Sequence, residues 1–204
     1  MKSFCPRFSA PISEARPKGA RLLEGYSPKL GRPIQLHDYA NFSVWVGLEA
    51  DPSVRAFCER PARFGLAGND SVIDFWVQRS NADESFQVLS NLPADDLPAT
   101  LHDIAVHYVR DGDVAASQVW VGNWIRILGV ITASRGLIEP ATLKAVREFV
   151  KEPVVLGRLE AQFSHGDPVR IRACIFELLR NGRLTAPQLH THPLTLYTSV
   201  GPAT

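Results

Sequence analysis

A change in hydropathy pattern near residue 112 constrains the fold of this chain of 204 residues more than any other feature. Before the change, short apolar runs are separated by residues that favour turns, which is typical of β-strands. After it, apolar residues recur at intervals of three and four, which is typical of helices. The sequence therefore predicts an α/β domain at residues 34–112 and a helical domain at residues 113–204.

Residues 1–33 differ from both halves, because they contain five prolines and show little apolar periodicity. They hold seven Lys or Arg residues against two acidic ones, a net charge of +5. We expect a basic, extended or partly disordered arm rather than a packed element. Lys29 and Arg32, in the segment SPKLGRP, are candidates for contact with phosphate groups.

The net charge of +1 is unevenly distributed, with −7 on residues 34–112 and +3 on residues 113–204. A basic arm and a mildly basic second half suit a protein that contacts a polyanion at its ends. Segments of this length also vary in charge by this much without any function, so the pattern alone decides nothing.

The α/β half is predicted to begin with a helix from Ile34 to Leu48. It ends before Asp51-Pro52, because a residue that precedes proline avoids the α region. Val54–Cys58 is predicted as a further helical turn or a short strand. Strands are expected at Arg63–Leu66, Ser71–Gln78, Phe86–Leu89 and Ile104–Val109, the first two joined by a turn at residues 67–70.

The second half is predicted to contain helices at Val114–Thr132, from Glu139-Pro140 to about Lys151, and at Leu156–Phe163. The last helix is best delimited, since Asp167 can cap it, Pro168 suits its first position and Asn181-Gly182 can end it. A strand is expected at Pro193–Val200. Three short helices followed by a strand are the outline of a winged-helix domain.

Several classes of protein are disfavoured. No apolar run reaches the length of a membrane span, and the N-terminal residues do not have the pattern of a signal peptide. The three cysteines, Cys5, Cys58 and Cys174, are too scattered for a disulfide framework or a zinc pair. We therefore expect a soluble, cytoplasmic protein with free thiols and no association with membranes.

One stretch carries a resemblance to a known family. The segment LEADPSVRAFCERP (Leu48–Pro61), followed by a hairpin that ends in IDFWV (Ile73–Val77), resembles the TnsA family of heteromeric transposase endonucleases. The resemblance covers roughly Asp38 to Leu89 and, more loosely, the helical second half. It implies a restriction-endonuclease-like, PD-(D/E)XK fold with a mixed sheet, followed by a helical, winged-helix-like domain.

The family reaction is hydrolysis of DNA with bound Mg²⁺, which needs carboxylates to hold the metal and a lysine to stabilise charge. The resemblance implies a glutamate on the first helix, an aspartate at the hairpin end and Gln-x-Lys or Glu-x-Lys on the next strand. In this chain Asp74 matches the aspartate and Gln87 the Gln or Glu. Leu89 occupies the lysine position, and a spacing of eight residues from Glu49 places Asn41 at the glutamate position.

These positions predict a remnant site, because Leu89 carries no charge and Asn41 is neutral. Asp74 is the one candidate metal ligand among the four. No lysine occurs between Arg32 and Lys144, although Asp38 and Glu84 are acidic residues that lie close to the site in sequence. Taken without the resemblance, Asp74 is an aspartate that makes a turn hydrogen bond at a strand end.

The resemblance implies double-stranded DNA and the transposase and AAA+ ATPase subunits of a mobile element as partners. We expect a non-cleaving, DNA-binding or architectural subunit that needs no cofactor, with homodimerisation left open. An active endonuclease that uses Mg²⁺ and a winged-helix DNA-binding regulator are the alternatives. Residues in and after the last helix are candidates for DNA contact, namely Arg170, Arg172, Arg180 and Arg183.

Two histidines, His190 and His192, lie two residues apart in the segment LHTHP. They would share one side of a strand that began early, and a shared metal ion is then conceivable. Solvated loop histidines are the commoner case, and no cysteine or third histidine lies nearby in sequence.

Overall fold

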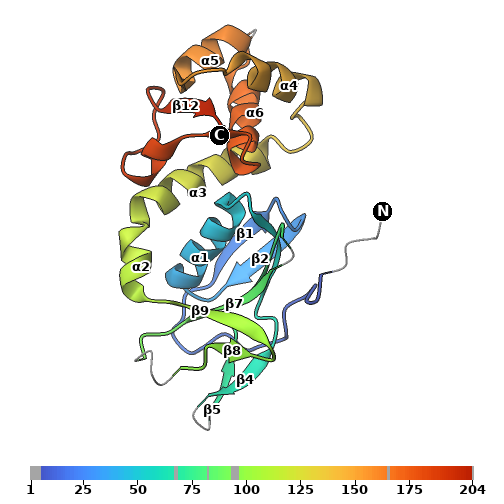
Figure 1. Cartoon of the computed structure of the whole chain (residues 1–204), viewed down its shortest axis with the longest axis vertical. Helices are drawn as coiled ribbons and strands as arrows, with labels where there is room; N and C mark the ends of the chain where they lie inside the picture. Colours follow the sequence, from blue (N-terminus) through green and yellow to red (C-terminus); the bar gives the residue numbers. More distant parts are fainter. Residues whose placement is uncertain (1–5, 67–68, 82, 93–96, 165, 204) are drawn as a thin grey trace. The chain divides into compact units, whose positions relative to one another are not determined.

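The computed structural model describes residues 6–66, 69–81, 83–92, 97–164 and 166–203, and it is a mixed α/β fold (Figure 1). The chain forms two compact units. Unit 1 comprises Met1–Leu48 and Ser53–Ala116, and unit 2 comprises Glu49–Pro52 and Ser117–Thr204. Among the described residues, no helix combines the length and apolar character needed to cross a membrane.

Unit 1 is built on a five-stranded mixed sheet in the order β3-β6-β7-β9-β8. Antiparallel pairs join β3 to β6, β6 to β7 and β8 to β9, whereas β7 and β9 run parallel. The parallel pair requires a crossover connection between Leu89, the end of β7, and Ile104, the start of β9. The strands are β3 (Val54–Glu59), β6 (Phe75–Arg79), β7 (Glu84–Leu89), β8 (Thr100–Leu101) and β9 (Ile104–Val109).

Both faces of this sheet carry buried side chains, because successive residues of a strand point to opposite faces. Trp76, Phe86 and Cys58 belong to a core cluster on one face. Phe57 and Phe75 pack edge to face with ring centroids 6.4 Å apart on the other. A separate hairpin of β4 (Arg63–Leu66) and β5 (Asn69–Val72) leads into β6.

The expectation of an unpacked arm at residues 1–33 is wrong at Phe8 and from Leu23 onward, where the chain packs within unit 1. Phe8 contacts the Trp76 ring at a centroid distance of 5.6 Å and belongs to the margin of the core cluster. Further along, β1 (Leu23–Ser27) and β2 (Arg32–Leu36) form an antiparallel hairpin. In β2 the buried Ile34 and Leu36 alternate with exposed residues, as expected of a strand with one face covered.

This hairpin also corrects the predicted helix start. Helix α1 spans Tyr39–Ala50 and does not begin at Ile34. Asp38 precedes it, and the Asp38 carboxylate accepts a hydrogen bond from the Asn41 backbone N–H at 2.6 Å. An aspartate that satisfies a first-turn N–H fixes the helix start, and the residues before it are then free to pair as a strand.

The predicted strand Ser71–Gln78 is two strands, β5 and β6, separated by Ile73 and Asp74. The Ile73 N–H donates to the Ala62 carbonyl, and the Asp74 carbonyl accepts from the Arg60 N–H. Here the chain leaves the β4-β5 hairpin and enters the larger sheet. The predicted turn at residues 67–70 includes residues 67 and 68, which lie outside the described residues.

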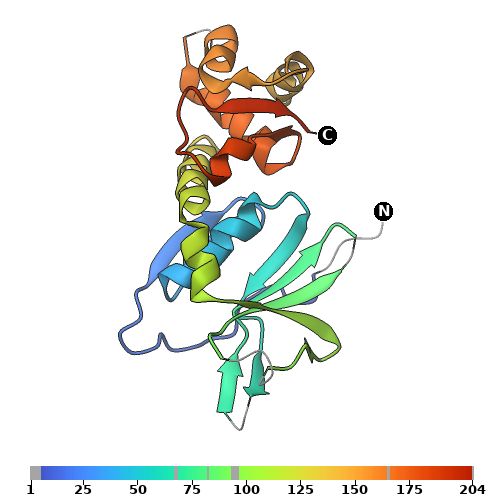
Figure 2. The same ribbon diagram turned by 60° about the vertical axis from the view of Figure 1, so that its left-hand side comes forward.

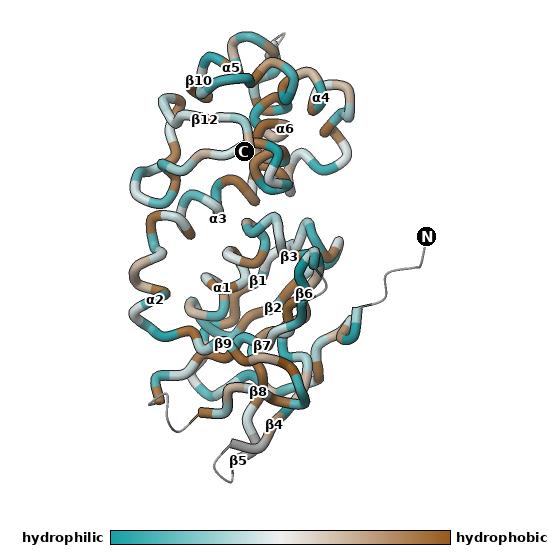
Figure 3. The backbone as a smooth tube through the Cα atoms, in the orientation of Figure 1, coloured by the Kyte–Doolittle hydropathy of each residue, from teal (hydrophilic) through white to brown (hydrophobic). Residues whose placement is uncertain are grey.

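Unit 2 surrounds helix α6 (Pro168–Arg180), which is largely buried. Asp167 caps it by accepting from the Val169 and Arg170 N–H groups, as predicted. The other helices of the unit are α3 (Gln118–Ala133), α4 (Pro140–Phe149) and α5 (Leu156–Phe163). Figure 3 shows that brown, hydrophobic residues alternate with teal, hydrophilic ones along α3.

A small antiparallel sheet completes unit 2, in the order β10-β12-β11. It is formed by β10 (Val154–Val155), β11 (Leu184–Thr185) and β12 (Ser199–Pro202), with the short 3-10 helix η2 (Pro187–His190) after β11 (Figure 2). The predicted strand Pro193–Val200 is mostly a loop, because β12 begins only at Ser199. The predicted helix Val114–Thr132 is divided at Ser117 into α2 (Asp111–Ala116) and α3.

Candidate functional site

The candidate site of unit 1 lies where three segments meet, namely the first turn of α1, the start of β6 and the end of β7. Asp74 immediately precedes β6. Its carboxylate accepts a hydrogen bond from the Leu89 backbone N–H at 2.8 Å. This bond joins the β5-β6 connection to the last residue of β7, fifteen residues further along the chain.

Asn41 places an amide between two carboxylates. Its side-chain nitrogen Nδ2 donates to Asp38 Oδ2 at 3.2 Å, and its side chain also forms a hydrogen bond with Asp74. The amide therefore supplies the compensating N–H groups that two neighbouring negative charges need. We refer to these three residues as the Asp38–Asn41–Asp74 cluster.

The pKa of Asp74, at the centre of the cluster, is raised above its usual value. Burial raises the pKa of Asp74 to about 6, and the neighbouring Asp38 carboxylate adds to the rise. Hydrogen bonds from the Leu89 N–H and from the Asn41 side chain oppose it by stabilising the ionised form. Near neutral pH the ionised Asp74 is therefore held by hydrogen bonds at a cost in desolvation.

The Asn41 amide occupies carboxylate oxygens that a divalent metal ion would otherwise use as ligands. It donates to Asp38 Oδ2 and forms a hydrogen bond with Asp74. Across the described residues, no three His, Cys, Asp or Glu side chains come together in an arrangement that would hold a metal ion.

The remaining positions of the predicted site are placed as follows. Gln87 pairs with Phe75, the residue after Asp74, on the neighbouring strand. Glu84 lies at the opposite end of β7, where it accepts from Trp76 Nε1 at 3.4 Å and pairs with Arg7. Glu84 is therefore not part of the cluster.

Lys29 does not supply the missing lysine. Its Nζ atom donates to the carbonyl oxygens of Leu48 at 2.8 Å and Val54 at 2.9 Å. The ammonium group thus lies at the C-terminal end of α1, where the helix dipole favours a cation, while the cluster occupies the N-terminal end.

Arg32, the other predicted phosphate contact near the N-terminus, is paired with Glu59. The two guanidinium nitrogens Nη1 and Nη2 bind the two carboxylate oxygens at 2.7 and 2.6 Å. Glu59 is only 2% exposed. The pair is bidentate, and its hydrogen bonds to Glu59 raise the pKa of Arg32.

The three arginines predicted on α6 all form ion pairs within unit 2. Arg170 binds Glu139 at 2.7 Å, Arg172 binds Glu160 through two bonds of 2.6 and 2.8 Å, and Arg180 binds Glu177 through two bonds of 2.8 and 2.6 Å. Arg183 follows the helix and is exposed. Only the Glu177–Arg180 spacing of three residues could have been recognised as a helical pair in the sequence.

No family model matches the chain, and no curated protein matches its sequence.

Proposed function

We propose that the chain is a non-cleaving, TnsA-like component of a DNA transposition system. Unit 1 would be a restriction-endonuclease-like domain with a remnant active site, and unit 2 a winged-helix-like domain. The observation that carries the proposal is the Asp38–Asn41–Asp74 cluster, which joins Asn41 and Asp74, two of the four positions that the resemblance names, to the neighbouring Asp38.

The arrangement of unit 1 supports the fold part of this proposal. The resemblance requires one residue from the first helix, one from the hairpin end and one pair from the next strand. Asn41 on α1, Asp74 before β6 and the Leu89 backbone on β7 are joined by hydrogen bonds. Residues so distant in sequence meet only when the helix and these strands adopt one particular arrangement.

The order of elements in unit 2 supports a winged-helix-like domain. Three helices, α4, α5 and α6, are followed by β11 and β12. The short strand β10, between α4 and α5, pairs with β12 and closes the sheet. A buried third helix with a small sheet beside it matches the expected outline.

The chemistry of the cluster supports loss of cleavage. Hydrolysis of a phosphodiester needs an activated water and a cation that stabilises the developing negative charge. Asn41 donates where the family has a carboxylate, and the Leu89 side chain provides no charge. The cluster retains a structural role instead, since it ties α1 to the start of β6 and the end of β7.

Plasmid nicking tests the proposal. The purified chain is incubated with supercoiled plasmid in Mg²⁺ and in Mn²⁺, beside Asp74→Ala as the matched variant. We expect no nicking above the level of the variant. In parallel, co-purification of a transposase or AAA+ ATPase subunit expressed from the same gene neighbourhood tests the assignment to a transposition system.

A winged-helix DNA-binding regulator is the second candidate, and the β10-β12-β11 sheet with its helices favours it equally. The two functions differ in their partners. A regulator would bind duplex DNA without binding either subunit, whereas a transposition component would bind at least one of them.

A further inference from the structure

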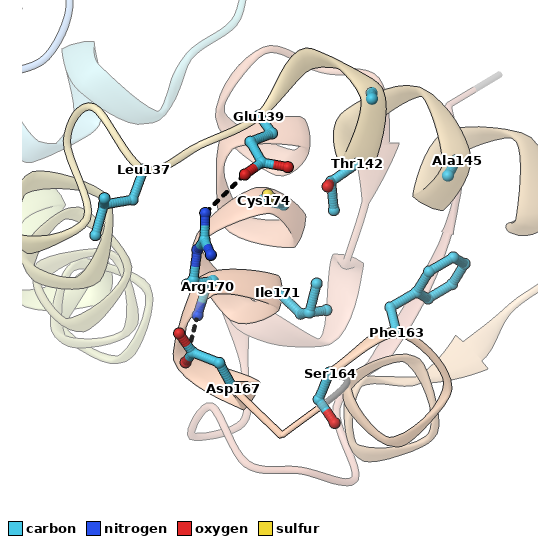
Figure 4. A pocket seen from close by; sticks show the side chains of 11 residues that line it. Leu137, Glu139, Thr142, Ala145, Phe163, Ser164, Asp167, Arg170, Ile171 and Cys174 are labelled. Atoms are coloured by element: carbon cyan, nitrogen blue, oxygen red, sulfur yellow. Dashed lines mark hydrogen bonds and ion pairs between the residues drawn. The ribbon is translucent and has the colours of Figure 1, made fainter.

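Unit 2 contains a pocket with a volume of about 540 Å³, whose walls come from α4, the end of α5 and the start of α6 (Figure 4). Pockets that hold small molecules in proteins usually have volumes of about 300 to 1,000 Å³, so this pocket has the size for such a ligand. The candidate site described above belongs to unit 1, and the pocket is not part of it.

The pocket is hollow because short side chains line its walls. Ala141 and Ala145 lie one helical turn apart on α4, so both face the pocket. Ile171 and Cys174 line it from α6, and both are buried. Two methyl groups and a thiol do not fill the space between the helices, and a cavity with an apolar floor remains.

The floor of the pocket is electrically neutral. The sulfur of Cys174 accepts a hydrogen bond from the Glu139 backbone N–H, which joins the residue before α4 to α6. Burial nevertheless raises the pKa of Cys174, so the thiol stays protonated near neutral pH. The floor can therefore hold the apolar part of a ligand, whereas a charged group placed there would lose its hydration without a partner.

Charged side chains stand on one side of the pocket. Figure 4 shows Glu139, Arg170 and Asp167 along this side and Phe163 on the opposite side. Arg170 forms an ion pair of 2.7 Å with Glu139, and the two side chains are 44% and 60% exposed. Among the described residues that line the pocket, two carboxylates and one guanidinium give a formal charge of −1. This side of the pocket therefore favours a cation.

Asp167 is the carboxylate that can bind a ligand without losing a partner. Its Oδ1 atom accepts from the Val169 N–H at 3.1 Å and from the Arg170 N–H at 3.3 Å, which caps α6. Both bonds use Oδ1, and the second oxygen, Oδ2, can accept a hydrogen bond from a ligand. Glu139, in contrast, would have to share its carboxylate with Arg170.

The opposite side of the pocket offers an aromatic ring. Phe163 packs edge to face on Phe149, with ring centroids 5.4 Å apart and an angle of 89° between the planes. This contact fixes the orientation of the Phe163 ring, which can pack against the apolar part of a ligand. The hydroxyl groups of Thr142 and Ser164 also line the pocket, and each can accept a hydrogen bond from an amine.

We propose that this pocket binds a small organic amine. Its ammonium group donates to Asp167, and its apolar part lies on the Ile171 and Cys174 floor, against Phe163. The charge of the lining selects the amine, because a carboxylate ligand would meet two carboxylates and would have to displace Glu139 from Arg170. The inference goes beyond the proposed function and does not depend on it.

Two-dimensional NMR of the isotopically labelled full chain tests the pocket with two probes that share a phenyl ring. Phenethylamine is a cation near neutral pH, and phenylpropionate is an anion. We expect phenethylamine to shift the backbone amide signals of Thr142, Ser164 and Ile171 in a saturable manner. Phenylpropionate should bind about tenfold more weakly or less, because an attraction to a partly exposed carboxylate is replaced by a repulsion.

Two variants locate the bound amine. Ala145→Leu fills the pocket from α4 and should raise the Kd for phenethylamine by about tenfold or more. Asp167→Asn removes the charge but keeps a side chain that caps a helix, and it should reduce the preference for the amine to within about twofold. The control is Ala161→Leu, the same substitution at an exposed residue of α5 outside the pocket, which should leave the Kd unchanged.

Each outcome decides the inference. Equal affinity for the two probes, signal shifts confined to residues outside the pocket, or no saturable shift at millimolar phenethylamine would overturn it. An unchanged Kd in Ala145→Leu would overturn it as well. Thermal unfolding without a probe shows whether each variant is folded, and Asp167→Asn decides the question if Ala145→Leu is not. None of these results bears on the proposed function, which plasmid nicking and partner binding test separately.

Discussion

Site residues were predicted from the sequence in two regions, the Asp38–Asn41–Asp74 cluster of unit 1 and the arginines of α6 in unit 2. The two sets of residues have different kinds of partner in the structure. In unit 1 two of the predicted residues, Asn41 and Asp74, bind each other, although they lie on separate segments. In unit 2 the predicted arginines bind Glu139, Glu160 and Glu177, which no motif had marked.

Of these two patterns, the one in unit 1 is the better indication of a site. Convergence of distant polar residues, with a shifted pKa at its centre, is uncommon unless a fold has been arranged around it. A charged stripe on a helix is common, and its arginines become candidates for a ligand only when their counterions are known.

The largest effect is expected from Asn41→Glu. The change removes the donor between Asp38 and Asp74 and adds a third negative charge, so we expect a loss of about 4 kcal/mol in the free energy of unfolding. Denaturant unfolding in a chelator measures this loss. Asn41→Ala is the matched variant and should lose less, because it removes the donor without adding charge. Equal losses in the two variants would show that no charge repulsion exists in the cluster.

The pH dependence of Asp74 gives the next effect. Its pKa is raised from 3.8 to about 6, so its contribution to stability is fully present below about pH 4 and is lost as the pH rises through about 6. The loss corresponds to about 3 kcal/mol. Asp74→Asn cannot ionise, so the difference in unfolding free energy between the variant and the unaltered chain should change by about this amount between pH 3 and pH 7. A constant difference would place Asp74 in a solvated environment.

Arg172→Ala should cost about 2 kcal/mol of stability, because it leaves the carboxylate of Glu160 nearly buried and unpaired. This loss of stability is smaller than the loss expected for a fully buried ion pair, because the Arg172 side chain is 34% exposed. Thermal and denaturant unfolding measure it, and affinity for a DNA duplex should stay within about twofold. A large fall in DNA affinity at unchanged stability would restore α6 as the DNA-contacting element.

Arg170→Ala should have the smallest effect, about 0.5 kcal/mol or less, because both members of its ion pair with Glu139 are well exposed. Unfolding at low and at high salt checks this value, since screening weakens an exposed pair further. A cost equal to that of Arg172→Ala would contradict the distinction between the two pairs.

The sequence predicted the local features that depend on nearby residues. The count of eight residues from Glu49, which the resemblance suggested, identified Asn41, and the Asn41 side chain forms a hydrogen bond with Asp74. Asp167 and Pro168 marked the start of α6, since capping is a matter of a few adjacent residues.

The features that failed depend on partners far away in the chain. Ile34 and Leu36 resembled the start of a helix, but their pairing with β1 makes them a strand. Ser71–Gln78 resembled one strand because nothing local shows that Ile73 and Asp74 change from one sheet to the other. The pairing of Arg172 with Glu160 spans twelve residues and two helices, so no local pattern reveals it.

The central claim is that the Asp38–Asn41–Asp74 cluster occupies the place of a nuclease site without its chemistry, and nicking of supercoiled plasmid by the unaltered chain tests it most directly. The account predicts no Mg²⁺- or Mn²⁺-dependent nicking above that of Asp74→Ala. Metal-dependent nicking by the unaltered chain that disappears in Asp74→Ala would contradict it.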